Sequence, residues 1–246
     1  MLKQIPNLIT SLNLLCGCMA VFFAISGDLV TASYFVFSGI FFDFFDGLAA
    51  RLLHAQSEVG LQLDSLADMV TSGVAPAVVM VQLLSESLTG APVSIADTFA
   101  IEGWNTGYHQ YLPFTGLLIA VGAAYRLAKF NVDTRQTTSF IGLPTPANAL
   151  LVLSLPLILA FHPSALMESL ILNSWFLIGI ILMGCVLMNA ELPLFALKFK
   201  SWDLKNNTVR YLFLLISVVA VVLLKFIAIP IILLIYVLLS LIWREN

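Results

Sequence analysis

The sequence predicts an all-α membrane protein, a polytopic bundle of about eight transmembrane helices. Apolar residues make up 60% of the 246 residues, charged residues only 10%, and the mean hydropathy is +1.00. Soluble domains carry a much larger charged fraction. The apolar residues are gathered into runs that suit membrane helices and are too long for the strands of a barrel. We therefore expect residues 1–246 to form a single membrane domain.

Eight segments approach the length of about 20 apolar residues that a helix needs to cross the hydrocarbon core. These segments are 8–26, 30–52, 62–84, 113–131, 145–161, 172–189, 208–225 and 227–243. The last two are separated only by Lys225 to Pro230. That stretch fits either a tight turn between two helices or a kink in one long helix.

The distribution of positive charge predicts the orientation. With eight spans, all but one of the Lys and Arg residues fall on one side, and Lys225 is the exception. The loop 86–112 contains neither Lys nor Arg. The positive-inside rule then places both termini in the cytoplasm and this loop outside. We expect a multi-pass protein of the cytoplasmic (inner) membrane.

The net charge of −3 and the lack of a basic stripe argue against a nucleic-acid partner.

Four carboxylates lie within the second and third predicted spans. Asp43 and Asp46 are three residues apart, and Asp64 and Asp68 are four apart, so each pair shares one helix face. A turn over roughly 53–61 lets the two helices run antiparallel and brings the acidic faces together. Ionisable groups inside a membrane segment are costly and usually functional. These side chains therefore predict a functional site near the cytoplasmic end of the bundle.

Clustered carboxylates at this depth predict bound cations. Like charges so close together cannot all remain ionised without a counter-ion. Hard oxygen ligands suit Mg²⁺, Mn²⁺ or Ca²⁺. Gly47, Ala50 and Gly60 are small enough to let a phosphorylated ligand approach the backbone, although small residues also serve close helix packing in membranes. Arg51 can neutralise a phosphate or act as a cytoplasmic anchor.

The pattern D-x2-D-G-x2-A-R-x8-G-x3-D-x3-D over residues 43–68 resembles the signature of the CDP-alcohol phosphotransferases. Every fixed position of that signature is present. The resemblance implies an integral membrane enzyme that cleaves the diphosphate of a CDP-linked lipid or alcohol. It also implies two divalent cations, Mg²⁺ or Mn²⁺, held by Asp43, Asp46, Asp64 and Asp68, with Asp68 as the general base.

Further segments resemble the phosphatidylserine synthases of this family. They are I-P-N-L-I-T-S-L-N-L-L-C-G (5–17), the stretch 63–77, Y-R-L-A-K-F-N-V-D (125–133) and G-L-P-T-P-A (142–147). Ser72 and Lys129 depart from the aromatic residue and the arginine that we expect there. Asn7, Thr10 and Asn13 share one helical side and can reach a nucleotide or its phosphates, although Asn7 can also cap the helix.

The resemblance implies that the phosphatidyl group of CDP-diacylglycerol passes to L-serine, giving phosphatidylserine and CMP. It also suggests a homodimer among membrane lipids. Serine is a zwitterion, and Arg126, Asn131 and Arg135 offer suitable groups, although the two arginines also fit cytoplasmic anchoring. One alternative is a sibling enzyme that uses glycerol 3-phosphate or an inositol phosphate, which would need a more basic pocket. The other is a divalent-cation transporter, which predicts acids near mid-membrane and repeat symmetry.

Overall fold

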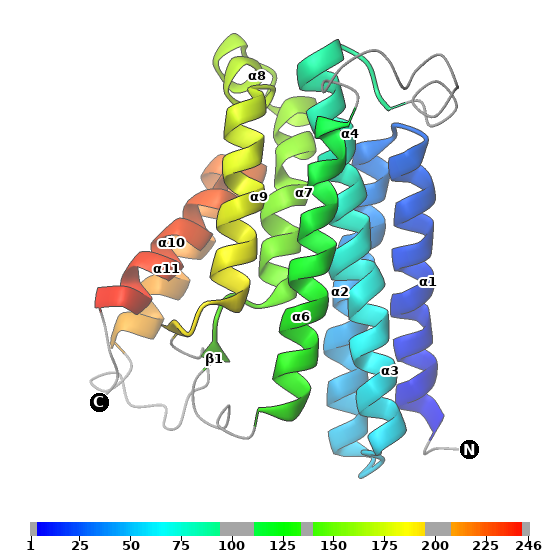
Figure 1. Cartoon of the computed structure of the whole chain (residues 1–246). Coiled ribbons are helices and arrows are strands. Elements are labelled where there is room, and N and C mark those ends of the chain that lie inside the picture. The colour runs from blue at the N-terminus through cyan, green and yellow to red at the C-terminus, as the bar shows by residue number, and fades with distance from the viewer. Residues whose placement is uncertain (1–3, 94–110, 134–139, 195–207, 243–246) are drawn as a thin grey trace, which may run out of the picture.

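A computed structural model describes residues 4–93, 111–133, 140–194 and 208–242. Its helices run mostly along one common axis, as Figure 1 shows. The only strands in these ranges are β1 (Phe140–Ile141) and β2 (Pro193–Leu194), a two-residue antiparallel pair. The predicted all-α class is confirmed, with that pair as a minor addition.

The first two helices form a hairpin. α1 (Ile5–Ile25) and α2 (Leu29–Leu52) are joined by a turn in which Gly27 has a φ of 86°, a conformation that glycine adopts without strain. Asp28 then caps α2, because its side chain accepts a hydrogen bond from Thr31 N at 3.0 Å. The bonds from Thr31 also hold the pKa of the Asp28 carboxyl below its ordinary value. This turn places the two helices side by side along their length.

The third helix is one continuous element with a change of pitch. It comprises α3 (Glu58–Asp68), a π-helical segment η2 (Met69–Val74) and α4 (Ala75–Thr89). Thr71 of η2 packs so closely on α1 and α2 that a Cβ added at Gly39 would lie 2.6 Å from Thr71 Cγ2. π-Helical turns are rare and often occur at functional sites. Here the turn begins directly after Asp68.

The next helices complete the bundle. A 3-10 segment η5 (Leu112–Leu117) leads into α6 (Leu118–Val132), which is followed by α7 (Thr145–Phe161), α8 (Ala165–Ile171) and α9 (Ser174–Asn189). The main core lies between α1, α2, α4, α7 and α9, and it contains Met80, Leu83 and Leu153. Beyond that core, much of the apolar side-chain surface of α1 and α2 is exposed. Such surface suits contact with lipid.

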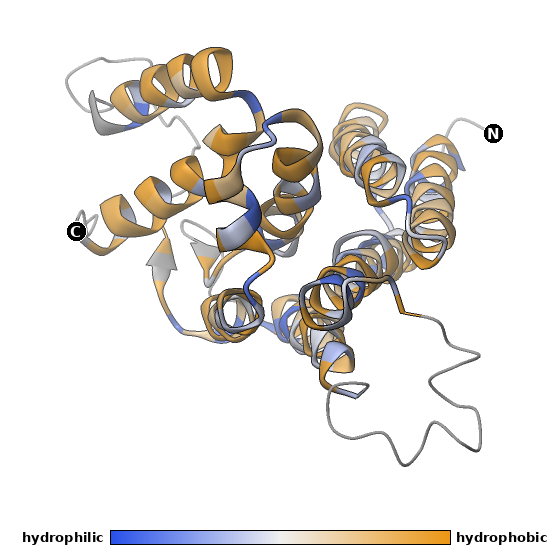
Figure 2. Cartoon of the chain, turned by 90° about the horizontal axis from the view of Figure 1, so that it is seen from above, coloured by the Kyte–Doolittle hydropathy of each residue, from blue (hydrophilic) through white to orange (hydrophobic). Residues whose placement is uncertain are grey.

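The last two helices form a second hairpin. α10 (Thr208–Leu224) and α11 (Ala228–Ile242) are joined by a 3-10 turn, η6 (Lys225–Ile227), in which Lys225 has a φ of 50°. The rings of Phe213 and Tyr236 are 5.8 Å apart. In one unbroken helix they would be about 35 Å apart at 1.5 Å per residue. The stretch from Lys225 is therefore a tight turn, and Figure 2 shows the two helices side by side.

Each of the eight predicted segments contains a helix in the described ranges. By length and composition alone, four helical segments there can cross a membrane: 5–25, 29–52, 58–89 and 210–241, the last of which is folded into the α10–α11 hairpin. A fifth results if α8 and α9, bent by 58°, count as one broken span. α7 is apolar but shorter. The count of eight crossings and the cytoplasmic termini stay predictions.

The orientation can be tested with two cysteines at opposite ends of the bundle. Gln56 lies in the turn between α2 and α3 at the end where α1 begins, and Glu168 lies on α8 at the other end (Figure 1). In a variant whose three native cysteines are replaced by alanine, Glu168→Cys should react with an impermeant maleimide in intact cells. Gln56→Cys should react only after lysis. Labelling of Gln56→Cys alone in intact cells would reverse the orientation.

Candidate active site

Three carboxylates from two helices converge near one end of the bundle. α2 carries Asp43 and Asp46, and α3 carries Asp64. One carboxylate oxygen from each can be chosen so that all lie within 4.8 Å of one another. Asp46 is only 4% exposed, and its Oδ2 is buried without a hydrogen-bond partner. The expected meeting of the two acidic faces therefore occurs.

This arrangement fits a divalent cation. Mg²⁺ and Ca²⁺ bind oxygen at about 2.0–2.6 Å, so two ligands of one ion lie at most about 5 Å apart. The three carboxylates satisfy that limit and offer only hard oxygen donors. The unpartnered Oδ2 of Asp46 is also the kind of buried atom that a cation would satisfy. Asp43, Asp46 and Asp64 are the residues that would hold it.

Asp68 is placed differently from the other acids. Its Oδ1 accepts a hydrogen bond from Asn13 Nδ2 of α1 at 3.3 Å, and its carboxyl interacts with that of Asp43. Asn13 is fully buried, and its backbone oxygen accepts a bond from Thr71 Oγ1 at 3.1 Å. The sequence placed Asn13 with the nucleotide-binding side chains. In the structure its amide nitrogen donates to the predicted base, and a contact with the nucleotide stays a prediction.

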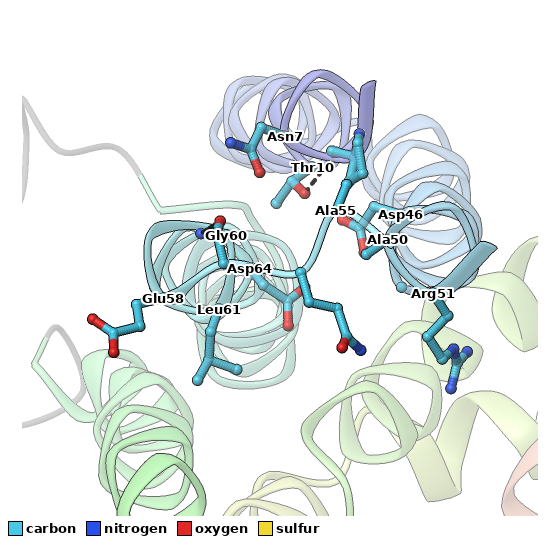
Figure 3. Close-up of a pocket in the computed structure, with 14 residues that line it drawn as sticks. Asn7, Thr10, Asp46, Ala50, Arg51, Ala55, Glu58, Gly60, Leu61 and Asp64 are labelled. Atoms are coloured by element: carbon cyan, nitrogen blue, oxygen red, sulfur yellow. Dashed lines mark hydrogen bonds between the residues drawn. The ribbon is translucent and has the colours of Figure 1, made fainter. Parts of the chain in front are cut away.

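A cavity of about 680 Å³ opens beside the acids, between α1, α2 and α3 (Figure 3). The sequence predicted six residues around a nucleotide or its phosphates, and every one of them lines this cavity, together with Asp46 and Asp64. Those six are Asn7, Thr10, Gly47, Ala50, Arg51 and Gly60. α1 therefore supplies one wall, and the two halves of the 43–68 pattern supply the others.

The turn between the two halves of the pattern also lines the cavity, and the sequence did not single it out. Gln56, Ser57 and Glu58 belong to this lining. Ser57 caps α3 by accepting a hydrogen bond from Gly60 N at 3.0 Å. The start of α3 thus faces the cavity, and helix N-termini favour anions such as phosphates. These positions fall in the eight-residue spacer of the pattern, residues 52–59, which contains no fixed residue. Its place between the two acidic helices was the sequence feature that could have pointed to them.

The three residues predicted to bind serine have different surroundings. Arg126 is 7% exposed, interacts electrostatically with Asp68, and places its guanidinium 5.7 Å from the ring centre of Phe130. Asn131 exchanges hydrogen bonds with Ser65 of α3, at 2.9 and 3.2 Å. Arg135 lies outside the described residues. Only Arg126 is thus seen beside the acids, and the serine assignment stays a prediction for all three.

The chain matches a family model described as CDP-alcohol phosphatidyltransferase over residues 3–188. The protein belongs to the CDP-alcohol phosphatidyltransferase family. The matched range covers α1 to α9 and contains all the residues discussed above, whereas the hairpin of α10 and α11 lies beyond it. As a member of this family the protein is an enzyme, which favours catalysis over cation transport as the role of the acids.

Curated relatives of this family member carry the name CDP-diacylglycerol–serine O-phosphatidyltransferase. The protein from Bacillus subtilis (strain 168) is 36% identical over 149 residues, 59% of this chain and 71% of the relative. One from Helicobacter pylori (strain J99) is also 36% identical over 149 residues, 60% of this chain and 54% of the relative. The protein from Saccharomyces cerevisiae is 35% identical over 133 residues, 50% of this chain and 40% of the relative. The chain thus spans only about half the length of several relatives it matches.

Metal binding can be measured without turnover. Titration of the purified protein with Mn²⁺, followed by electron paramagnetic resonance, should show a bound ion that a chelator removes. Asp64→Asn should weaken the affinity at least about ten-fold, because it removes one of three charged oxygen ligands. Glu58→Gln is the matched control, because this exposed carboxylate lines the same cavity outside the acid cluster. Equal affinity in wild type and Asp64→Asn would exclude Asp64 as a ligand.

Proposed function

We propose that this enzyme transfers the phosphatidyl group of CDP-diacylglycerol to the hydroxyl of L-serine, releasing CMP. The observation that supports it best is the convergence of three carboxylates at the edge of a cavity lined by all six predicted nucleotide-binding residues. The names of the relatives favour serine as the acceptor. In the reaction, the serine oxygen bonds to the lipid-side phosphorus as the bond from that phosphorus to the CMP oxygen breaks.

The acids supply the cation site in this proposal. The four aspartates together would hold two divalent cations, and Asp43, Asp46 and Asp64 lie close enough to share one of them. Mg²⁺ or Mn²⁺, or alternatively Ca²⁺, would stabilise the diphosphate charge and the departing phosphate. Four carboxylates balance the charge of two such ions, which makes their shared burial tolerable.

The cavity positions the nucleotide part of the donor. Asn7 and Thr10 present polar groups from α1, while Gly47 and Ala50 leave the α2 backbone open to the ligand. Arg51 lies at the rim of the cavity, where a guanidinium suits a phosphate oxygen (Figure 3). Gly60 brings the ligand close to the start of α3. The donor's acyl chains can then remain in the surrounding lipid.

Asp68 takes the proton of the serine hydroxyl. Asn13 holds one of its carboxylate oxygens, which restricts the rotation of the side chain and leaves the other oxygen for the substrate. A base held within hydrogen-bond reach of the hydroxyl is the geometry that proton transfer requires. Arg126 of α6, which interacts electrostatically with Asp68, is the described cation that can attract the serine carboxylate toward this base.

The wider setting follows from charge and exposure. We propose a single membrane domain of residues 1–246 in the cytoplasmic membrane, with eight spans, both termini inside and the active site facing the cytoplasm. Phosphatidylserine would then be released into the inner leaflet. The exposed apolar side chains of α1 and α2, such as Leu8 and Phe22, suit contact with lipid or with the second subunit of a homodimer.

The choice of acceptor can be tested by measuring CMP release. Purified enzyme with CDP-diacylglycerol and Mn²⁺ should release CMP with L-serine, and much less with glycerol 3-phosphate, inositol phosphate or serinol. Serinol lacks the carboxylate that a buried arginine would pair with. A preference for glycerol 3-phosphate would replace serine as the substrate and leave the reaction class standing. No CMP release with any alcohol would contradict the proposed reaction.

The role of Asp68 can be separated from metal binding. Asp68→Asn should lower kcat by at least about 100-fold, because a neutral amide is a poor base. The variant should still bind CDP-diacylglycerol in the presence of Mn²⁺, since the three-acid cluster remains. Glu168→Gln is the control, because this exposed carboxylate lies on α8 and does not line the cavity. Near wild-type turnover would exclude Asp68 as the base, and loss of both binding and turnover would make it chiefly a metal ligand.

A further inference from the structure

A second group of buried polar atoms lies away from the nucleotide cavity. The side chains of Ser72, Arg126, Thr145 and Asn148 are each no more than 7% exposed. Their Oγ, Nε and Oγ1 atoms, and both amide atoms of Asn148, have no hydrogen-bond partner. Buried polar groups are normally paired, because leaving them without a partner costs free energy. Such a concentration of unpaired atoms in a membrane bundle indicates a place where a polar ligand binds.

Ser72 and Asn148 lie at the same depth in the bundle. Ser33 Oγ of α2 donates to Leu153 O of α7 at 3.5 Å, and the two helices run in opposite directions (Figure 1). Six residues after Ser33, about 9 Å along its axis, α2 reaches Gly39. Six residues before Leu153, the same distance in the same direction, α7 is at Ala147, next to Asn148. Gly39 is also where Thr71, the neighbour of Ser72, packs against α2. The unpaired groups of η2 and α7 are therefore level.

Arg126 lies near both the level of Ser72 and the predicted base, Asp68. A Cβ added at Gly73 would lie 3.2 Å from the Cβ of Ala123, so α6 and η2 touch there. α6 and η2 run in opposite directions (Figure 1). Arg126, three residues after Ala123 on α6, therefore lies nearer than Ala123 to the level of Asp68. The electrostatic interaction between Arg126 and Asp68 agrees with this placement. The unpaired groups thus lie on the α6 and α7 side of Asp68, whereas the nucleotide cavity lies on the α1 side.

Asn148 occupies a space that a glycine leaves open. A Cβ added at Gly184 of α9 would lie 3.2 Å from Asn148 Cγ and closer still to its Oδ1. One helical turn further along α9, Met188 lines a narrow cleft together with Arg126 and Asn189. The amide of Asn148 is therefore held beside α9, next to the cleft that Arg126 also lines.

We propose that Asn148, with Thr145 and Ser72, forms the subsite for the polar end of the acceptor alcohol, next to Arg126. The amide offers two donors and an acceptor, the hydroxyls offer both, and Arg126 supplies one cation. Among the described residues there, Arg126 is the buried cation, and the nearby Lys129 is paired with Glu191. One buried cation among neutral polar groups suits a zwitterion such as serine better than an acceptor that carries a phosphate dianion. This inference rests on the proposed function and adds to it the α7 residues that select the acceptor.

The central test compares the KM values of the two substrates. Asn148→Ala should raise the KM for serine at least about ten-fold, the effect of losing a hydrogen bond to a charged group. The KM for CDP-diacylglycerol and the affinity for Mn²⁺ should stay within two-fold or so, since the nucleotide cavity and the acids are untouched. Ser154→Ala is the matched control, because this hydroxyl is equally buried on α7 but donates to Leu151 O at 2.6 Å.

A second variant acts on Asn148 from a neighbouring helix. Gly184→Ala should displace the amide and raise the serine KM in the same direction. In the Asn148→Ala background the Gly184→Ala change should add little, because the group it displaces is already gone. Additive effects would overturn the assigned link between these residues. If Asn148→Ala does not fold, as judged by thermal unfolding, Thr145→Val decides the question by the same comparison of KM values.

Two results would overturn the subsite. The first is an unchanged serine KM in folded Asn148→Ala, which would mean that water alone satisfies these atoms. The second is an equal rise in both KM values, which would indicate a general disturbance of the bundle. Failure of the proposed function is separate, because it appears in wild type. If wild-type enzyme prefers another alcohol, the same variants are measured with that alcohol, and a selective rise in its KM supports the subsite.

Discussion

The placement of four wholly or partly buried carboxylates inside apolar helices is the constraint on which the rest of this structure depends. Uncompensated, such charges would oppose insertion and helix packing. Their positions on facing sides of α2 and α3 allow cations to offset the charge, and in the proposed reaction such cations would also stabilise the diphosphate. In the proposed function, structural and catalytic requirements converge on Asp43, Asp46, Asp64 and Asp68.

Close helix packing around the acids gives the site its geometry. Gly17 and Gly39 let Thr71 approach the backbones of α1 and α2 more closely than any side chain at those positions would permit. Thr71 then bonds to the Asn13 backbone, and the Asn13 side chain bonds to Asp68. The π-helical turn η2 begins directly after Asp68 and supplies Thr71. Asp68 is thus held where three helices pack closely at small residues, a common mode of helix association in membranes.

The two sides of Asp68 differ in a way that matches two different substrates. On the α1 side an open cavity of about 680 Å³ is lined by small residues and by the start of α3, which suits a large anionic nucleotide. On the α6 and α7 side, buried neutral groups lie around Arg126, the buried cation among the described residues there, which suits a small zwitterion. A base between two such regions can receive a proton from one substrate as that substrate attacks the other.

The sequence by itself determined the membrane class, the positions of the helices, the acid cluster and six of the residues that line the cavity beside it. These features depend on local hydropathy and on spacing within residues 43–68, both of which survive in a one-dimensional pattern. The tertiary structure alone decided that the last two helices form a hairpin, that Asn13 holds Asp68 and that Asn148 lies level with Ser72. Those contacts join segments far apart in the chain. They depend on how the side-chain volumes of neighbouring helices fit together, as where the Asn148 amide occupies the space left by Gly184. No pattern within a single helix specifies which distant helix will fill that space.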